Sequence, residues 1–206
     1  MNYNLEMEKQ MEKINEGEKI LLHACCAPCS SACIERLAEV FEIYIYYFNP
    51  NITIEDEYKK RLDEIDGFIS KLDTKYPIHL VKGEYDPKVF FEISKGLENE
   101  PERGKRCYKC YKLRLDDTAK MADKMNIKYF ASTLTLSPYK NSDWVNEIGE
   151  LLDKKYNSHY LYSDFKKKNG YKRSIELSKK YNLYRQNYCG CVYSIREGIE
   201  EWNIIV

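Results

Sequence analysis

The chain has 206 residues, and its 33 basic and 33 acidic side chains give a formal net charge of zero. This balance excludes a global electrostatic attraction to nucleic acid or to a membrane surface, and no apolar run approaches the roughly 20 residues that a transmembrane helix needs. The length is sufficient for one domain with a buried core. Because the charged stretch 1–18 lacks the apolar centre of a signal peptide, we expect a cytoplasmic protein without a membrane partner.

Helical and strand patterns alternate along the chain. A thin apolar stripe predicts an amphipathic leader helix over 1–18, ahead of a single α/β domain over 19–206. Short apolar runs predict strands at 19–23, 42–48, 78–81, 128–135 and 159–162. Apolar residues at steps of three and four predict helices from the turn after His23 to about Phe41, then at 54–75, after Asp86-Pro87, at 107–125, 142–156 and 174–182, and lastly up to Trp202.

This alternation predicts a doubly wound α/β fold with a parallel sheet of about five strands, because strand–helix–strand crossovers are right-handed almost without exception. Ligands of such folds bind at the carboxyl ends of the strands, where the strand order reverses. The first strand delivers the stretch HACCAPC (23–29) to that edge. The fourth delivers 132–141, and the helix that begins near Cys107 is expected to open there too.

Seven of the eight cysteines fall into three groups. These are Cys25 and Cys26 with Cys29, Cys107 with Cys110, and Cys189 with Cys191 across a glycine. In a reducing compartment such clusters bind metal or do redox chemistry more often than they form structural disulfides. Two C-x-x-C pairs alone indicate structural zinc. Iron–sulfur clusters are also held by thiolates, however, and seven sulfurs exceed what one four-coordinate zinc ion uses.

Two other interpretations of single cysteines follow from the same spacing. Cys26 and Cys29 fit a thioredoxin-like dithiol, although this would leave Cys25 and the distant pairs unexplained. Cys33 lies four residues beyond Cys29 on the predicted helix, and we expect it in the core, because free cysteine buries like a small apolar residue.

Four motifs resemble one known family. HACCAPCS after the first strand, RCYKCYKLRL, STLTLSPYKN and GYKRSIELSKKYNLYRQNYCGCVYS are similar, in order and spacing, to the QueH family of epoxyqueuosine reductases. The resemblance covers nearly the whole chain from Lys19 onward. It implies a nucleotide α-hydrolase-like (HUP-like) sheet and a metalloenzyme domain over 19–206. The implied activity is the last step of queuosine biosynthesis, removal of the epoxide oxygen of epoxyqueuosine at the tRNA wobble position.

The resemblance also implies cofactors and partners. The cofactors would be a [4Fe-4S] cluster and an adjacent mononuclear metal ion, which we expect to be iron, without cobalamin. The substrate would be tRNA that carries epoxyqueuosine, with the tRNAs for tyrosine, histidine, asparagine and aspartate expected. An external electron donor would be needed. Carried over by motif, the metal ligands are Cys25, Cys26, Cys29, Cys107 and Cys110, and their division between cluster and ion stays open.

The catalytic candidates are His23, Cys189 and Cys191. Cys189 and Cys191 are either further ligands or a redox-active disulfide that relays electrons, and the second interpretation is slightly favoured. His23 is either a proton carrier or a strand residue that bonds to the backbone. At the last position of the first motif we expect aspartate in some relatives, whereas this chain has Cys29 there.

Basic and aromatic residues indicate an RNA surface. Residues 166–185 hold eight basic side chains and one acidic side chain, and loop bases of RNA are recognised by aromatic stacking with cations on the phosphates. The predicted contacts are Tyr139, Lys140, Asn141, Lys166, Lys167, Lys168 and Arg173. Two alternatives stay open: residues 139–141 form an ordinary turn after Pro138, and the lysines form a solvated surface without an RNA partner.

Two rival functions remain. One is a zinc-stabilised RNA-binding module without catalysis. The other is a tRNA thiolase or ATP pyrophosphatase on the same sheet, but its phosphate-binding loop would need the Ser-Gly-Gly-x-Asp-Ser type of sequence that Cys25 to Cys29 replace.

Overall fold

The computed structural model describes residues 1–195, so most of the predicted last helix lies outside the described part of the chain. The strands are β1 (Glu18–His23), β2 (Phe41–Tyr47), β3 (Ile78–Lys82), β4 (Tyr129–Ser132) and β5 (His159–Tyr160). The helices are α1 (Tyr3–Met11), α2 (Ala27–Leu37), α3 (Glu55–Ile69), α4 (Pro87–Ser94), α5 (Lys105–Lys124), α6 (Ser142–Asp153) and α7 (Gly170–Lys180), with short 3-10 turns η1 (Thr133–Leu136) and η2 (Val192–Ser194).

The five strands form one parallel sheet in the order β3-β2-β1-β4-β5, which confirms the predicted fold class. The chain builds the sheet outward from β1 to β3 and then returns to place β4 and β5 on the other side of β1. The strand order therefore reverses between β1 and β4. In such folds this reversal opens the crevice in which ligands bind.

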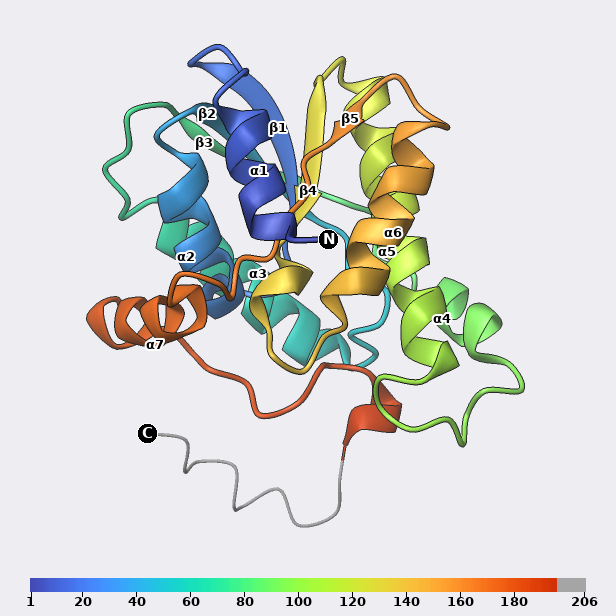
Figure 1. The fold of residues 1–206 in the computed structure, drawn as a ribbon. Helices are drawn as coiled ribbons and strands as arrows, with labels where there is room; N and C mark the ends of the chain where they lie inside the picture. Colours follow the sequence, from blue (N-terminus) through green and yellow to red (C-terminus); the bar gives the residue numbers. More distant parts are fainter. Residues whose placement is uncertain (196–206) are drawn as a thin grey trace.

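Helices cover both faces of the sheet (Figure 1). α1, α2, α3 and α7 lie on one face and α5 and α6 on the other. The middle of β1, Ile20–Leu22, is apolar on both faces because it meets both layers: Ile20 and Leu22 belong to the core under α2, whereas Leu21 belongs to the core under α5. This alternation follows from the two-residue period of a strand.

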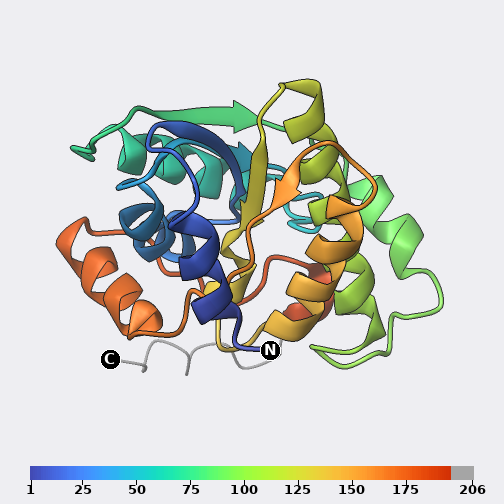
Figure 2. The ribbon, with the colours of Figure 1, turned by 45° about the horizontal axis from the view of Figure 1, so that its top comes forward.

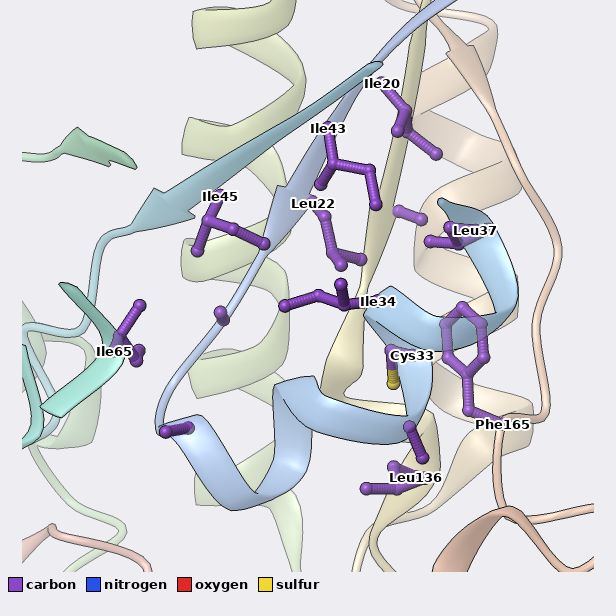
Figure 3. Packing of buried hydrophobic residues seen from close by; sticks show 14 of the residues in the cluster. Ile20, Leu22, Cys33, Ile34, Leu37, Ile43, Ile45, Ile65, Leu136 and Phe165 are labelled. Atoms are coloured by element: carbon purple, nitrogen blue, oxygen red, sulfur yellow. The ribbon is translucent and has the colours of Figure 1, made fainter. Parts of the chain in front are cut away.

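α2 provides the apolar face that covers the centre of the sheet. Figure 3 shows Ile34 and Leu37 of this helix directed at Ile43 and Leu22 of the strands. Cys33 is fully buried in the same cluster, which confirms its predicted place in the core. Because α2 follows the cysteine-rich turn directly, this packing also fixes the position of the turn.

α1 packs on the sheet and ends at Met11, well before the predicted end near Gly17. Its Met7 is fully buried in the core. The side chain of Gln10 donates to the carbonyl of Tyr160 and accepts from the amide of Tyr162. These bonds hold α1 beside the segment after β5, as Figure 2 shows.

β4 is shorter than predicted. The sequence predicts a strand as far as Thr135, but β4 ends at Ser132, whose hydroxyl accepts from the amide of Leu134 at 3.2 Å. This side-chain bond turns the chain into η1. Of the helices within residues 1–195, none has the length and apolarity that a passage through a bilayer would need.

Two helical glycines give a matched test of the packing. A Cβ atom at Gly149 in α6 would lie 2.4 Å from the buried ring of Tyr160, whereas one at Gly67 in α3 would meet no atom within 4 Å. We expect Gly149→Ala to lower the free energy of unfolding by about 1–3 kcal/mol through overpacking. Gly67→Ala should raise it by about 0.5–1 kcal/mol, because alanine restricts the unfolded chain. Urea unfolding measures both, and a Gly149→Ala variant at least as stable as the wild type would contradict the packing described.

Candidate active site

The candidate site is built where β1 and β4 end. β1 stops at His23, and the amide of Ala24 still donates to the carbonyl of Tyr46 at 3.0 Å. The chain then enters α2 with Cys26 at the N-cap position and Pro28 in the first turn, where a missing amide hydrogen costs nothing. The HACCAPC turn therefore stands at the sheet edge where a ligand is expected.

Three thiols of this turn lie close together. The sulfur atoms of Cys25, Cys26 and Cys29 are all within 4.8 Å of one another. Cys25 and Cys26 are buried and Cys29 is half-buried. All three lie at the N-terminus of α2, where the helix dipole and unpaired amides favour a negative charge. This cysteine trio, Cys25, Cys26 and Cys29, has the donor atoms and the spacing to hold a metal ion.

Without a metal, Cys25 is the member of the trio that most readily carries a negative charge. Hydrogen bonds from the thiols of Cys26 and Cys29 hold the pKa of Cys25 well below its usual range, and Arg114 contributes further. Beside that thiolate, the pKa of Cys26 is raised to about 12, and the pKa of Cys29 is raised as well. A metal cation would reverse the last two shifts, because it favours the deprotonated form of each ligand.

A second group of thiols forms around the start of α5. Cys110 packs with Cys191 and Phe90 in one buried cluster. Burial raises the pKa of Cys110 to about 12, and the neighbouring sulfurs of Cys189, Cys191 and Cys107 act in the same direction. The second C-x-x-C pair and the C-G-C pair, which are far apart in the sequence, therefore meet in space.

Residues 181–195, which we call the strap, bring the C-G-C pair to the carboxyl edge of the sheet (Figure 1). The guanidinium of Arg61 on α3 donates to the carbonyls of Tyr188 at 3.3 Å and Cys189 at 3.2 Å. Arg61 is 1% exposed, and its Nε donates to the carboxylate of Glu57 at 2.6 Å. One buried ion pair therefore fixes the backbone on which Cys189 is mounted.

The glycine of the C-G-C pair is required by its surroundings. Gly190 has φ of +106°, and a Cβ atom there would lie 2.9 Å from the side chain of Ile52. Its carbonyl accepts from the amide of Thr53 at 3.2 Å. Further along the strap, Gln186 Nε2 donates to the sulfur of Cys26 at 2.9 Å, so the strap also contacts the cysteine trio directly.

A cavity of about 400 Å³ lies between the trio, the loop after β4 and the strap. Of the predicted site residues, it is lined by Cys25, Cys29, Tyr139, Lys140 and Cys189. Tyr171, the aromatic residue within the predicted RNA-binding segment, also lines it, whereas the sequence did not point to several other lining residues: Arg61, Arg114, Arg185, Gln186 and Tyr188. Cations predominate, since Glu102 is the one acidic side chain among the described residues of the lining.

Lys140 contacts a thiol. Its Nζ lies 3.0 Å from the sulfur of Cys189. Burial alone would raise the pKa of Cys189, but the charges of Lys140 and Arg114 lower it below its usual value. The pKa of Cys191 is raised by burial and by the Cys189 thiolate. The two thiols of the C-G-C pair are therefore unequal, and Cys189 is the one that more readily carries a negative charge.

His23 lies outside the cavity lining. It is fully buried, with Nδ1 3.0 Å from the hydroxyl of Ser132 and Nε2 3.2 Å from the carbonyl of Phe48. Burial lowers its pKa to about 4, so the imidazole is neutral at pH 7. The partners of its two ring nitrogens, Ser132 and Phe48, stand at the ends of β4 and β2, so His23 connects the ends of three strands. The role of His23 as a proton carrier stays a prediction.

The predicted RNA contacts other than Tyr139 and Lys140 also lie outside the lining. Asn141 caps α6 by accepting from two of its amides. Lys166 pairs with Asp164. Three further predicted cations lie near or beyond the start of α7: Lys167 is exposed, Lys168 pairs with Glu8, and Arg173 pairs with Glu35 and Glu176.

One lining residue that the sequence analysis did not identify has a signal in the sequence. On a helix, residues three and four positions apart share a face, and Arg114 follows Cys110 by four and Tyr111 by three. Its place among the thiols could therefore have been predicted. Arg61 has no such signal, because Glu57 four residues before it suggests an ordinary surface pair and its other partners lie on the strap.

Comparisons with known proteins agree with this geometry. The family described as "Epoxyqueuosine reductase QueH" matches residues 20–197. Proteins named epoxyqueuosine reductase QueH from Streptococcus pyogenes serotype M1 and Staphylococcus epidermidis are 43% and 42% identical to this chain. Each match covers 97% of this chain, with 81% and 87% of the respective relative. A protein of the same name from Thermotoga maritima is 32% identical over 88% of this chain and 93% of its own.

Proposed function

The chain belongs to the epoxyqueuosine reductase QueH family, and we propose that it removes the epoxide oxygen of epoxyqueuosine at the tRNA wobble position to give queuosine. The observation that carries this proposal is the convergence of Cys25 and Cys29 of the trio with Cys189 on one cavity. Opening the epoxide to an alkene consumes two electrons and two protons and releases one water. A site for this reaction therefore needs an electron source and a group that stabilises negative charge on the leaving oxygen.

The thiols fit a metal centre. The trio has three sulfurs within 4.8 Å, and Cys107 and Cys110 add two more donors near the strap. These five residues would hold a [4Fe-4S] cluster and an adjacent iron ion, without cobalamin. Such a centre supplies single low-potential electrons and a Lewis-acidic position. A zinc-stabilised RNA-binding module is less favoured, because the relatives described above are named as reductases.

The cavity suits a nucleoside that is turned out of its RNA. Its tyrosines, Tyr139, Tyr171 and Tyr188, offer rings on which an unstacked base can stack. Lys140 and Arg185 at the same cavity can meet the negative backbone. A tRNA substrate and the free thiols agree with a cytoplasmic location.

We assign the C-G-C pair the part of an internal electron store. Oxidation of Cys189 and Cys191 to a disulfide releases two electrons and two protons, which is the amount that one epoxide consumes. An external donor must then reduce the disulfide before the next turnover. The lowered pKa of Cys189 and its contact with Lys140 support this assignment, because thiol–disulfide exchange begins from a thiolate.

The first prediction concerns the metal centre. Anaerobically purified protein should be brown, contain iron and sulfide, and convert epoxyqueuosine to queuosine in tRNA when a low-potential reductant is supplied. Cys26→Ala should lose iron and activity, because the trio would lose one ligand. Cys33→Ala, a core cysteine outside the cavity, is the matched control and should keep both. Mass spectrometry of digested tRNA measures the product, and a colourless active protein that holds only zinc would refute the proposed centre.

The second prediction concerns the C-G-C pair. With Cys189→Ser/Cys191→Ser, a single turnover should proceed when the cluster and the iron ion together enter the assay with two electrons, whereas repeated turnover should slow, because the internal store is missing. Rapid-quench and steady-state assays on the same preparation separate the two. Equal rates for the variant and the wild type in both assays would rule out the relay.

The third prediction concerns the RNA surface. On binding RNA, Lys168 and Arg173 would replace their carboxylate partners with phosphates. Breaking these exposed ion pairs costs little free energy, because each contributes only about 0–1 kcal/mol to stability. We expect replacement of Lys166, Lys167, Lys168 and Arg173 by glutamine to weaken tRNA binding. The slope of log K against log salt should fall by about 0.7–0.9 for each phosphate that the variant no longer neutralises.

The control for this test uses the opposite edge of the sheet. Glutamine replacements there remove the same number of charges where the strands begin; the positions are Lys19, Lys71, Lys75 and Lys128. This variant should bind tRNA with the slope of the wild type. An unchanged slope in the first variant would show that the predicted cations do not contact RNA.

A further inference from the structure

Two cations near the cysteines, Arg114 and Lys140, have no carboxylate partner within residues 1–195. Arg114, in the middle of α5, is 1% exposed, and its Nε makes one long hydrogen bond of 3.4 Å to the carbonyl of Cys110. Its Nη2 is buried and makes no hydrogen bond. Among residues 1–195, no ion pair includes Arg114 or Lys140.

The other two deeply buried arginines show how unusual this is. Arg61 pairs with Glu57 and donates to two strap carbonyls. Arg106 donates to three carbonyls of the loop before α5. A guanidinium cannot lose its proton in a protein, and an unpaired buried charge costs several kcal/mol. Arg114 therefore requires an anion that its neighbours must supply.

The charges of cysteine thiols act on Arg114. The charges that act on it most strongly belong to Cys110, Cys189 and Cys25, which represent all three cysteine groups of the sequence. Lys140 lies 3.0 Å from the sulfur of Cys189. Arg114 and Lys140 thus place two positive charges between the three cysteine groups of the sequence. Arg114 also lines the cavity, but its Nη2 is closed off from solvent, so a substrate in the cavity does not reach that atom.

We propose that Arg114, assisted by Lys140, is the counter-charge of the thiolate-bound metal centre and raises its reduction potential. This inference rests on the metal centre of the proposed function. Cluster potentials depend on net charge, hydrogen bonding and burial, and a fixed cation favours the form that carries the additional electron. Arg114 would then act through the centre as a positioning residue that tunes its potential.

The experiment separates charge from shape on Arg114. Arg114→Met removes the charge at similar volume and Arg114→Lys retains the charge. Each protein is reduced stepwise without oxygen, and the reduced fraction is followed by electron paramagnetic resonance together with iron and sulfide content. At a fixed ambient potential, Arg114→Met should show at least a tenfold lower ratio of reduced to oxidised centre, which is about 59 mV for one electron. Arg114→Lys should stay near the wild type.

Two further variants keep the test decisive. Lys140 is half-exposed in a loop, so Lys140→Met is expected to fold. It should also lower the reduction potential, which keeps the test available if Arg114→Met does not fold. Lys154→Met, which removes an exposed charge paired with Glu150, should leave the potential unchanged. Loss of iron from Arg114→Met but not from Arg114→Lys supports the proposal, because charge is then what the centre needs. Loss from both variants contradicts it.

The failure of this inference is distinct from failure of the proposed function. A wild-type protein without an iron centre would refute the proposed centre and the inference with it. A wild-type centre whose potential is the same in Arg114→Met and Lys140→Met would overturn the counter-charge alone and leave the proposed reductase intact.

Discussion

The site depends on the buried pair of Arg61 and Glu57. The strap has no strand or long helix to satisfy its backbone, and buried carbonyls must find donors elsewhere. Arg61 supplies two of these donors, to Tyr188 and Cys189, while its charge is balanced by Glu57. Loss of one partner in such a pair costs about 3–5 kcal/mol, because the other is left charged and buried. The position of the C-G-C pair over the cysteine trio is therefore determined by a helix that carries no cysteine.

The local charge of the site is hidden by the neutral composition. The whole chain has as many acidic as basic side chains, yet the cavity gathers Arg61, Arg114, Lys140 and Arg185 beside sulfur ligands. Glu57 balances the charge of Arg61, whereas Lys140 is bonded to the sulfur of Cys189 and the charges that act most strongly on Arg114 are those of thiols. The cations therefore indicate a bound group that is more negative than the free thiols.

The sequence predicts what depends on local pattern. Short apolar runs that alternate with helical patterns, together with crossover handedness, were sufficient for the parallel sheet. Motif spacing was sufficient for the cysteine trio, since its members are neighbours on one turn. Long-range contacts were not predictable. Lys140 was expected on RNA, and its contact with Cys189 spans 49 positions of sequence. The end of β4 was missed because one hydroxyl, that of Ser132, turns the chain.

The cysteine turn also shows how one structural device serves different anions. In nucleotide-binding proteins of this architecture, a glycine-rich turn lets phosphate approach the N-terminus of the first helix. Here Cys26 caps that helix and Pro28 occupies its first turn, so the same positive end faces sulfur. The amides and dipole that would hold a phosphate now favour a thiolate at Cys25. The sheet thus fixes where an anion is stabilised, and the side chains of the turn decide whether that anion is a substrate phosphate or a metal ligand.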